Sequence, residues 1–443
     1  MVNVVLGFTE KDFNKSQLTS NYFPTKVGGK PVWLDLSNIP KREELFCEKC
    51  SKQMAFLMQI YAPIDENEDS FHRMVHIFCC KDPRCGYYAA VRTQLPQVNS
   101  FYPSDADERK YDENYEDLYK QQPEYTKNRQ NTCDYCGCFA KSNCSGCKKV
   151  YYCSKEHQQL DWELGHSEQC KLLKDLNIID INNLEENKKI PRKRVSDFLF
   201  KELDIITESL ELKEFPPPTT TTTTTTTTDD KNTNTNGNSN TESINNLKID
   251  SDDEYDDDND EDDIDLDENG NPVYKNEIGK ELIPTNGGET MTNDPEAIGK
   301  FEDYIGETGK KAEFNEETFT KIKDKSLIYF KRIVDNDQDQ ILRYSKDSNY
   351  PILWVSDTDQ APEPIPQCSN CGSNRKFEFQ ILPQLLYFLD MDSTLANNSF
   401  DIDFGILSIY TCESSCQIKS NTTTTTTSPS FVKEYIFKQD FKK

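Results

Sequence analysis

The chain has 443 residues, with 51 lysines and arginines against 78 aspartates and glutamates, so its formal net charge is -27. Only 35% of its residues are hydrophobic, and this low share predicts that part of the chain is unfolded. It contains no run of about 18 apolar residues, which excludes a membrane-spanning helix, and its N-terminus lacks a secretory signal. A chain this acidic is repelled by nucleic acid and anionic membranes, so neither is an expected partner.

Sixteen cysteines point to metal sites. In a chain without a secretory signal we expect thiols to stay reduced, so disulfides are not expected. Two cysteines spaced Cys-x-x-Cys can hold one tetrahedral metal ion, and four such pairs occur: Cys47 with Cys50, Cys133 with Cys136, Cys144 with Cys147, and Cys368 with Cys371. Each pair is followed by a second Cys or Cys/His pair, which indicates structural zinc.

Residues 1–125 are predicted to form an N-terminal β unit. Alternating and continuous apolar runs predict strands at 54–61, 75–80 and 87–92. Its second ligand pair ends in Cys85 and begins at either Cys79 or Cys80. His72 and His76 have no partner at a metal-ligand spacing, so we interpret them as ordinary residues of the strand region.

A compact cysteine-rich module is predicted at 130–172. Eight candidate ligands suffice for two four-coordinate zinc ions, and they are Cys133, Cys136, Cys144, Cys147, Cys153, His157, His166 and Cys170. About 40 residues have too little core to fold alone, so the metals must supply most of the stability. The module contains no nucleophile and base pair, which argues against catalysis.

The module resembles the MYND zinc finger through Tyr152-Cys-Ser-Lys-Glu and Asp161-Trp162. In that family the ligand pairs interleave. The resemblance therefore implies one zinc on Cys133, Cys136, Cys153 and His157 and another on Cys144, Cys147, His166 and Cys170. It also implies a module that accepts proline-containing peptides, although a purely structural spacer stays open as an alternative.

The next segments are predicted to be a connector, at 173–211, and a disordered linker, at 212–298. The linker contains ten consecutive threonines, Thr219 to Thr228, and a block in which 14 of the 19 residues from Asp250 to Glu268 are acidic. Such a block repels itself and buries too little apolar surface to offset its ordering entropy. It is either a solubilising spacer or an acidic arm that screens a basic partner.

Residues 299–443 are predicted to form a C-terminal β unit that repeats the first. A helix is expected at 317–334, followed by strands at 377–381, 406–412 and 431–437. Trp33 and Trp354 each lie 14 residues before the first cysteine of a Cys-x-x-Cys pair, and Phe56 and Phe377 each lie six residues after the second. Agreement at several such offsets indicates an internal duplication.

The duplication selects the terminal ligands, because it aligns Cys80, rather than Cys79, with Cys412. One zinc is then expected on Cys47, Cys50, Cys80 and Cys85, and another on Cys368, Cys371, Cys412 and Cys416. Four zinc ions are thus expected in all, and Cys138 is left over. The predicted fold class is mainly β, with two zinc-ribbon-like halves pairing into one pseudo-symmetric domain and the finger and acidic loop inserted between them.

Both ends of the chain resemble the programmed cell death protein 2 family. The N-terminal resemblance rests on Val27-Gly-Gly-Lys-Pro-Val-Trp-Leu34, Gln59-Ile-Tyr-Ala-Pro63, Phe71-His-Arg73 and Phe78-Cys-Cys-Lys-Asp-Pro-Arg-Cys85. The C-terminal resemblance rests on Gln340-Ile-Leu-Arg-Tyr344, Phe377-Glu-Phe-Gln-Ile-Leu-Pro-Gln-Leu-Leu386 and Tyr410-Thr-Cys-Glu-Ser-Ser-Cys416. Members with a MYND finger also carry a His at the position of His157.

The resemblance implies a dedicated chaperone for one newly made basic protein of the small ribosomal subunit, the uS-five protein (eukaryotic S-two). It therefore implies a role in ribosome biogenesis, in the cytoplasm and also in the nucleus. Complementary charge suits such a partner, since it speeds encounter and covers basic segments that would otherwise bind RNA.

Three other functions are weighed against the chaperone. A MYND adaptor in transcription or apoptosis is the main alternative. An enzyme is not expected, because the Asn-His-Ser cofactor signature of MYND methyltransferases is absent. Direct nucleic-acid binding rests only on a basic cluster, and the total charge opposes it; the cluster is Lys188, Lys189, Arg192, Lys193 and Arg194.

Overall fold

The computed structural model describes the chain in several stretches, which are residues 2–82, 84–102, 129–174, 196, 198–212, 324–345, 350–389, 402–417 and 430–442. The chain divides into two compact units, one of residues 1–219 with 314–443 and one of residues 220–313. All described residues belong to the first unit. The predicted disordered linker, except its first residue Leu212, lies outside the described residues, as does the basic cluster at 188–194.

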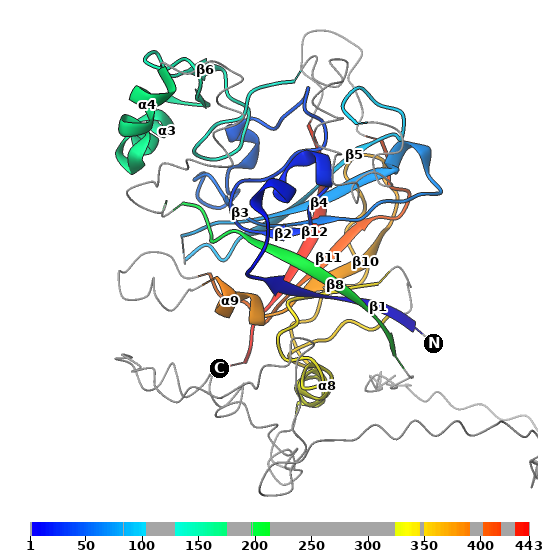
Figure 1. Ribbon diagram of the computed structural model, residues 1–443. Coiled ribbons are helices and arrows are strands. Elements are labelled where there is room, and N and C mark those ends of the chain that lie inside the picture. The colour runs from blue at the N-terminus through cyan, green and yellow to red at the C-terminus, as the bar shows by residue number, and fades with distance from the viewer. Residues whose placement is uncertain are drawn as a thin grey trace, which may run out of the picture. The chain divides into compact units, whose positions relative to one another are not determined.

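Ten strands form a closed antiparallel barrel in the order β1-β8-β2-β3-β4-β5-β12-β11-β10-β9 (Figure 1). Their bounds are β1 Val2–Glu10, β2 Lys26–Val27, β3 Ala55–Tyr61, β4 His72–Cys79, β5 Tyr88–Leu95, β8 Leu203–Leu212, β9 Leu342–Tyr344, β10 Arg375–Ile381, β11 Ile406–Cys412 and β12 Val432–Gln439. The expectation of a mainly β fold with small zinc modules is confirmed.

Few helices accompany the barrel in the described stretches. The α-helices are α3 (Lys155–Asp161), α4 (Ser167–Lys174), α8 (Lys325–Val334) and α9 (Gln384–Phe388), with the π-helical turn η6 (Trp162–His166) between α3 and α4. Short 3-10 turns are η1 (Lys15–Leu18), η2 (Ser20–Tyr22), η3 (Arg42–Leu45) and η4 (Glu68–Ser70), and β6 (Ser142–Asn143) pairs with β7 (Tyr151–Tyr152). No helix of the described stretches has the length and apolar character needed to cross a membrane.

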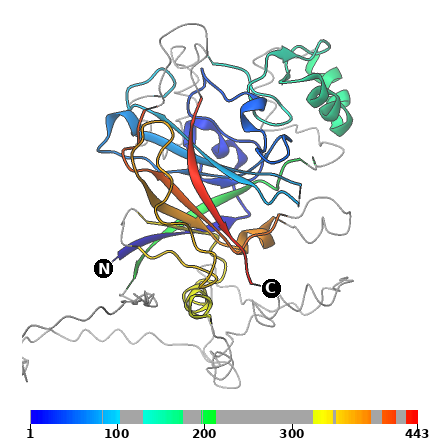
Figure 2. The same ribbon diagram turned by 180° about the vertical axis from the view of Figure 1, so that it is seen from behind.

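The barrel consists of two halves with the same internal order. Counted outward from the β5–β12 pair, one half is β5-β4-β3-β2-β8 and the other is β12-β11-β10-β9-β1. The red strand β12 in Figure 2 lies between β5 of the first half and β11 of the second. The duplication extends to irregularities, because β3 shifts register between Phe56 and Met58 and β10 shifts between Phe377 and Phe379.

A buried glutamine makes an equivalent hydrogen bond in each half. Gln59 of β3 accepts a hydrogen bond from the backbone N–H of Val32 at 2.9 Å. Gln380 of β10 accepts one from the N–H of Leu353, also at 2.9 Å. Each glutamine thereby satisfies a backbone donor that folding removes from water, and it fixes the segment leading to that half's tryptophan.

The two outermost strands are exchanged between the halves. β1 comes from the N-terminus but completes the C-terminal half by pairing with β9, whereas β8 completes the N-terminal half by pairing with β2. The interval 173–211, which we expected to be a connector, therefore contains most of a barrel strand. The side chains of Leu203 and Ile205 pack in the barrel core. This short alternation of apolar and polar residues was too weak to predict a strand from the sequence alone.

The C-terminal helix is shorter than predicted. α8 begins at Lys325, because Asp324 has an extended backbone and its carboxylate accepts a hydrogen bond from the N–H of Leu327 at 3.1 Å. An N-cap of this kind marks the first helical residue. The prediction of one helix over 317–334 is thus wrong at residue 324, and residues 317–323 lie outside the described part.

Two buried ion pairs join the halves. Arg73 of β4 donates to both carboxylate oxygens of Glu378 on β10, at 2.6 and 2.7 Å. Arg92 of β5 donates to Glu434 of β12 at 2.7 Å. Burial by itself raises the pKa of Glu378, but the charge and hydrogen bonds of Arg73 bring it below its ordinary value. The Glu378 carboxylate is therefore charged inside the barrel and depends on Arg73. Glu434 pairs with a second arginine as well, Arg375, at 3.1 Å.

We expect Arg73→Met to lower the free energy of unfolding by about 3–5 kcal/mol, because Glu378 would keep a buried charge without its partner. Denaturant unfolding at neutral pH with zinc present measures this difference. Lys433→Met is the matched control: it breaks a pair with Glu48 in which both side chains are 57% exposed, and exposed pairs contribute below about 1 kcal/mol. Equal effects of the two changes would contradict the assigned role of Arg73.

Candidate metal centres

Four clusters of cysteine and histidine side chains could each hold a metal ion. Within each cluster the ligand atoms lie within 4.8 Å of one another. The four sets are Cys47, Cys50, Cys80 and Cys85; Cys133, Cys136, Cys153 and His157; Cys144, Cys147, His166 and Cys170; and Cys368, Cys371, Cys412 and Cys416. These are the sets expected from the sequence, including the interleaved pairing in the finger and the choice of Cys80.

The donor sets fit zinc well. Four sulfurs, or three sulfurs and one imidazole nitrogen, suit a closed tetrahedral zinc site. Such a site is structural and leaves no position for a reacting water. Bound zinc supplies cross-links between distant parts of the chain. The four clusters agree with the four zinc ions expected.

Each cluster starts from the same tight turn, in which the residue after the second cysteine of a Cys-x-x-Cys pair adopts a left-handed conformation. These residues are Ser51 (φ 58°), Gly137 (φ 76°), Lys148 (φ 58°) and Gly372 (φ 80°). The N–H of each bonds to the carbonyl of the first cysteine at 2.8 Å. The turn places both sulfurs on one side of the backbone.

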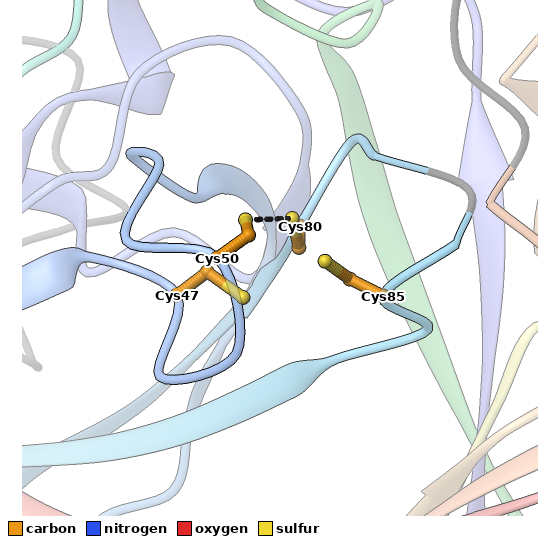
Figure 3. Close-up of side chains that lie close together, drawn as sticks. All are labelled: Cys47, Cys50, Cys80 and Cys85. Carbon is orange, nitrogen blue, oxygen red and sulfur yellow. Dashed lines mark hydrogen bonds between the residues drawn. The ribbon is translucent and has the colours of Figure 1, made fainter.

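The N-terminal centre joins this turn to the end of β4 (Figure 3). Cys47 and Cys50 lie on the turn after η3, whereas Cys80 and Cys85 flank the loop that leads into β5. The sulfurs of Cys50 and Cys80 lie 3.5 Å apart. A hydrogen bond from the backbone of Lys52 is the main cause that lowers the pKa of Cys50, to about 7, so thiolate is available to a metal at neutral pH.

The two finger centres are built from short helices. Ser154 caps α3 by accepting a hydrogen bond from the N–H of His157 at 3.2 Å, and this first helical turn brings Nδ1 of His157 to 3.2 Å from the sulfur of Cys153. The second centre uses the turn that follows, where Nε2 of His166 lies 3.7 Å from the sulfur of Cys147. Between them Gly165 has φ 139°, which ends the first helical run and redirects the chain.

The finger and the N-terminal centre share one apolar cluster. Indole Nε1 of Trp33 donates to the carbonyl of Gly137 at 2.8 Å, and a Cβ at Gly137 would lie 2.8 Å from Cδ of Pro31. Buried cysteines of both modules belong to the cluster around Trp33. The sequence marked Trp33 as part of the repeat and of the N-terminal resemblance but did not predict that it contacts the finger.

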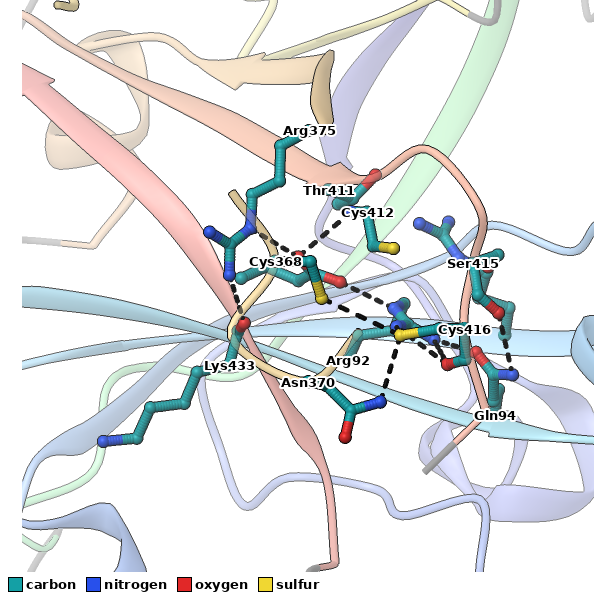
Figure 4. Close-up of polar contacts among 12 residues, drawn as sticks. Arg92, Gln94, Cys368, Asn370, Arg375, Thr411, Cys412, Ser415, Cys416 and Lys433 are labelled. Atoms are coloured by element: carbon teal, nitrogen blue, oxygen red, sulfur yellow. Dashed lines mark hydrogen bonds and ion pairs between the residues drawn. The ribbon is translucent and has the colours of Figure 1, made fainter. Parts of the chain in front are cut away.

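The C-terminal centre has a different support, which comes from the other half of the barrel (Figure 4). Both terminal nitrogens of Arg92 lie 3.1 Å from the carbonyl oxygen of Cys416. Gln94, two residues along β5, donates to the carbonyl of Ser415 at 3.2 Å. The loop that carries Cys412 and Cys416 is therefore held by β5 of the N-terminal half. No spacing rule could have indicated Arg92 or Gln94.

This centre is also the most open of the four. Cys371 is exposed and Cys416 is half-buried, and their sulfurs pair with Cys412 at 3.5 Å and Cys368 at 3.7 Å. Hydrogen bonds from Ser373 are the main cause that lowers the pKa of Cys371, to about 6. A thiolate exposed in this way is open to chelators and oxidants once its metal leaves.

Two cysteines belong to none of the clusters. Cys79 faces the barrel core, where burial raises the pKa of its thiol to about 12, and such a thiol is inert. Cys138 is buried within the finger, with its sulfur 3.8 Å from the side-chain amide of Gln53. The expectation that Cys138 is left over agrees with this placement.

Comparison with known protein families gives matches over most of the described chain. The "Programmed cell death protein 2, N-terminal domain" matches residues 3–109, the "Programmed cell death protein 2, C-terminal putative domain" matches residues 324–440, and the MYND finger matches residues 133–170. No solved structure matches this chain.

Two curated relatives align with nearly the whole chain. The chain is 30% identical to programmed cell death protein 2 of Rattus norvegicus over 99% of its own length and 97% of the relative's. It is 31% identical to the protein of that name from Bos taurus, over 98% and 96% of the two lengths. Programmed cell death protein 2-like of Homo sapiens is 39% identical over 101 residues, which cover 23% of this chain and 26% of the relative.

Native mass spectrometry should detect four zinc ions per chain. Cys371→Ser should give a population with three, because it removes one sulfur from the most exposed centre. Cys79→Ser should keep four, since Cys79 lies in the barrel core and outside the clusters. A wild-type content of two zinc ions would rule out the terminal centres.

Arg92→Lys should make the C-terminal centre release its zinc about ten times faster or more, because losing a group that orients a ligand commonly costs 10–100-fold in metal affinity. Lysine keeps the charge opposite Glu434 but lacks the two donors that hold Cys416. Release to a coloured chelator measures the rate of each zinc. Arg73→Lys serves as the control, because Arg73 is also a buried arginine but makes no hydrogen bond to a cysteine-bearing loop. The zinc ions of the other three centres should leave at unchanged rates in both variants.

Proposed function

Since the chain belongs to the programmed cell death protein 2 family, we propose that it is a zinc-stabilised chaperone for a newly made basic protein of the small ribosomal subunit, the uS-five protein (eukaryotic S-two). In this proposal it supports assembly of the small subunit, and it works in the cytoplasm and in part in the nucleus. The family resemblance supplies the identity of the client. The barrel provides a fixed shape on which such a client could bind, and most of the chain's excess negative charge lies outside the described residues.

The observation that carries the proposal is the single barrel built from both family domains in a chain of net charge -27. Unassembled ribosomal proteins are basic and bind RNA readily, so their chaperone needs complementary charge and a fixed surface. Charge complementarity speeds encounter and disfavours binding of RNA to the same chain. The metal cross-links and buried ion pairs hold the loops of the barrel in place.

We propose no catalytic role for the zinc centres. Their sulfur and nitrogen donors complete four-coordination without water, and a zinc ion needs an open position to activate a nucleophile. Their role in this proposal is to hold the loops in place.

A protein-interaction adaptor is the second candidate, and the finger surface supports it. Trp162 is 45% exposed and Leu172 is 53% exposed, with Leu160 nearby in sequence at 37%. Exposed apolar side chains gathered on so small a module suit a proline-containing peptide. The name of the relatives, programmed cell death protein 2, fits a partner in regulation of cell death.

Affinity purification of the tagged full chain, after new rRNA synthesis is blocked, separates the two candidates. We expect strong recovery of the uS-five protein without ribosomes, because the client would wait on its chaperone. A matched variant, Trp162→Ala with Leu172→Ala, should recover it equally well. Recovery of transcription or apoptosis regulators in its place, lost in the finger variant, would support the adaptor and contradict the chaperone.

A further inference from the structure

Strand β8 extends well beyond its partner β2. On one side, β8 pairs with β1 from Asp204 to Leu212. On the other side, β2 pairs only with Leu203 and Asp204, and the last bond to this side joins the N–H of Ile205 to the carbonyl of Thr25 at 3.2 Å. Among the described stretches, no strand pairs with this second side of β8 beyond Ile205.

The bond at Ile205 fixes which backbone groups face this open edge. In a strand the N–H and C=O groups of alternate residues point to opposite sides. Because the backbone N–H of Ile205 points away from β1, the backbone N–H and C=O groups of Thr207 and Ser209 point away from β1 as well. Their amide and carbonyl groups form a ladder that another extended chain could complete.

The exposed side chains along this stretch add specificity to the edge. Ile206 and Leu210 are 44% and 36% exposed, and the exposed Glu208 lies between them on the same face. Their cross-strand partners are Phe8, Leu6 and Val4. Leu6 and Val4 are buried in a cluster with Tyr350, and the partly buried Phe8 packs against it, so the apolar surface continues from a packed cluster to the open edge. Neither β1 nor β8 contains a lysine or an arginine.

We propose that the outer edge of β8 binds an extended basic segment of the client protein as an added antiparallel strand. This inference rests on the proposed function and names the surface that performs it. Backbone pairing with Thr207 and Ser209 supplies affinity, as in other strand-addition complexes. A cationic side chain opposite Glu208, between two aliphatic residues that contact Ile206 and Leu210, supplies specificity.

A second copy of this chain fits the edge less well. Antiparallel pairing of two β8 strands about Ser209 or Thr207 would bring acidic side chains of one copy near those of the other, and like charges across a strand pair are destabilising. The absence of any basic residue in the β1–β8 ribbon favours a partner of opposite charge.

The test uses the full chain co-expressed with the uS-five protein. Thr207→Pro with Ser209→Pro removes the two edge donors and leaves the bonds to β1, since proline is tolerated on an edge that faces away from its partner strand. Thr207→Ala with Ser209→Ala keeps both donors and is the matched control. Equal zinc content and melting temperature of the two double variants establish that the barrel is intact.

We expect the proline variant to bind the uS-five protein at least about tenfold more weakly than the alanine variant, because it lacks the two edge N–H donors that would pair with the client strand. If the proline variant does not fold, Glu208→Lys is used in its place and should weaken binding by a similar factor. Its control is Glu43→Lys, at an exposed acid on η3. This control changes the net charge equally and should not weaken binding.

The outcomes separate this inference from the proposed function. If wild type binds the uS-five protein and the variants bind it equally well, the β8 edge is not the site, whereas the chaperone proposal stands. If wild type does not bind it, the chaperone proposal fails and this inference fails with it. A wild-type dimer that the proline variant loses would identify a second copy as the occupant and would overturn the inference.

Discussion

The tight Cys-x-x-Cys turn is the local geometry on which the metal centres depend. It needs only a left-handed residue and one backbone hydrogen bond, so it can form before any distant part of the chain arrives. The second ligand pair of each terminal centre comes from a strand end about 30–40 residues further along the sequence. Zinc therefore converts a local turn into a long-range cross-link, which in the terminal centres is added to a barrel that has its own apolar core.

The two halves share a fold but hold their metal centres in different ways. In the N-terminal half the centre and the finger share apolar contacts around Trp33. In the C-terminal half, the loop of Cys416 is held by polar groups of Arg92 and Gln94 from the opposite half. In this duplicated scaffold, apolar packing thus supports one metal centre and hydrogen bonds support the other. These hydrogen bonds make the C-terminal centre part of the contact between the halves.

The sequence predicted the features that are local or repeated. Ligand sets follow from short spacings, and the choice of Cys80 over Cys79 followed from comparing one half with the other. The central strands were predictable because their residues are buried on both faces: on β4, Val75 and Ile77 face the barrel core whereas Phe78 lies under the cluster around Trp33.

Long-range pairing was beyond the sequence. β1 and β8 carry ordinary alternating patterns, and nothing in them indicates that each completes the half distant from it in the chain. Arg73 and Glu378 lie 305 positions apart, and a buried charged residue has no signature until its partner is known. The start of α8 depends on Asp324, one of many acidic residues in that region that could have capped a helix.

The exchange of β1 and β8 has a consequence for how the protein is made. The chain's first strand can pair with β8 once residue 212 has left the ribosome, but its other neighbour, β9, is translated more than a hundred residues later. During that interval the N-terminal portion is an open sheet, and the edge of β1 that pairs with β9 has no partner. Closure of the barrel is therefore one of the last events of synthesis, and a truncated product would keep an unsatisfied border that favours aggregation or degradation.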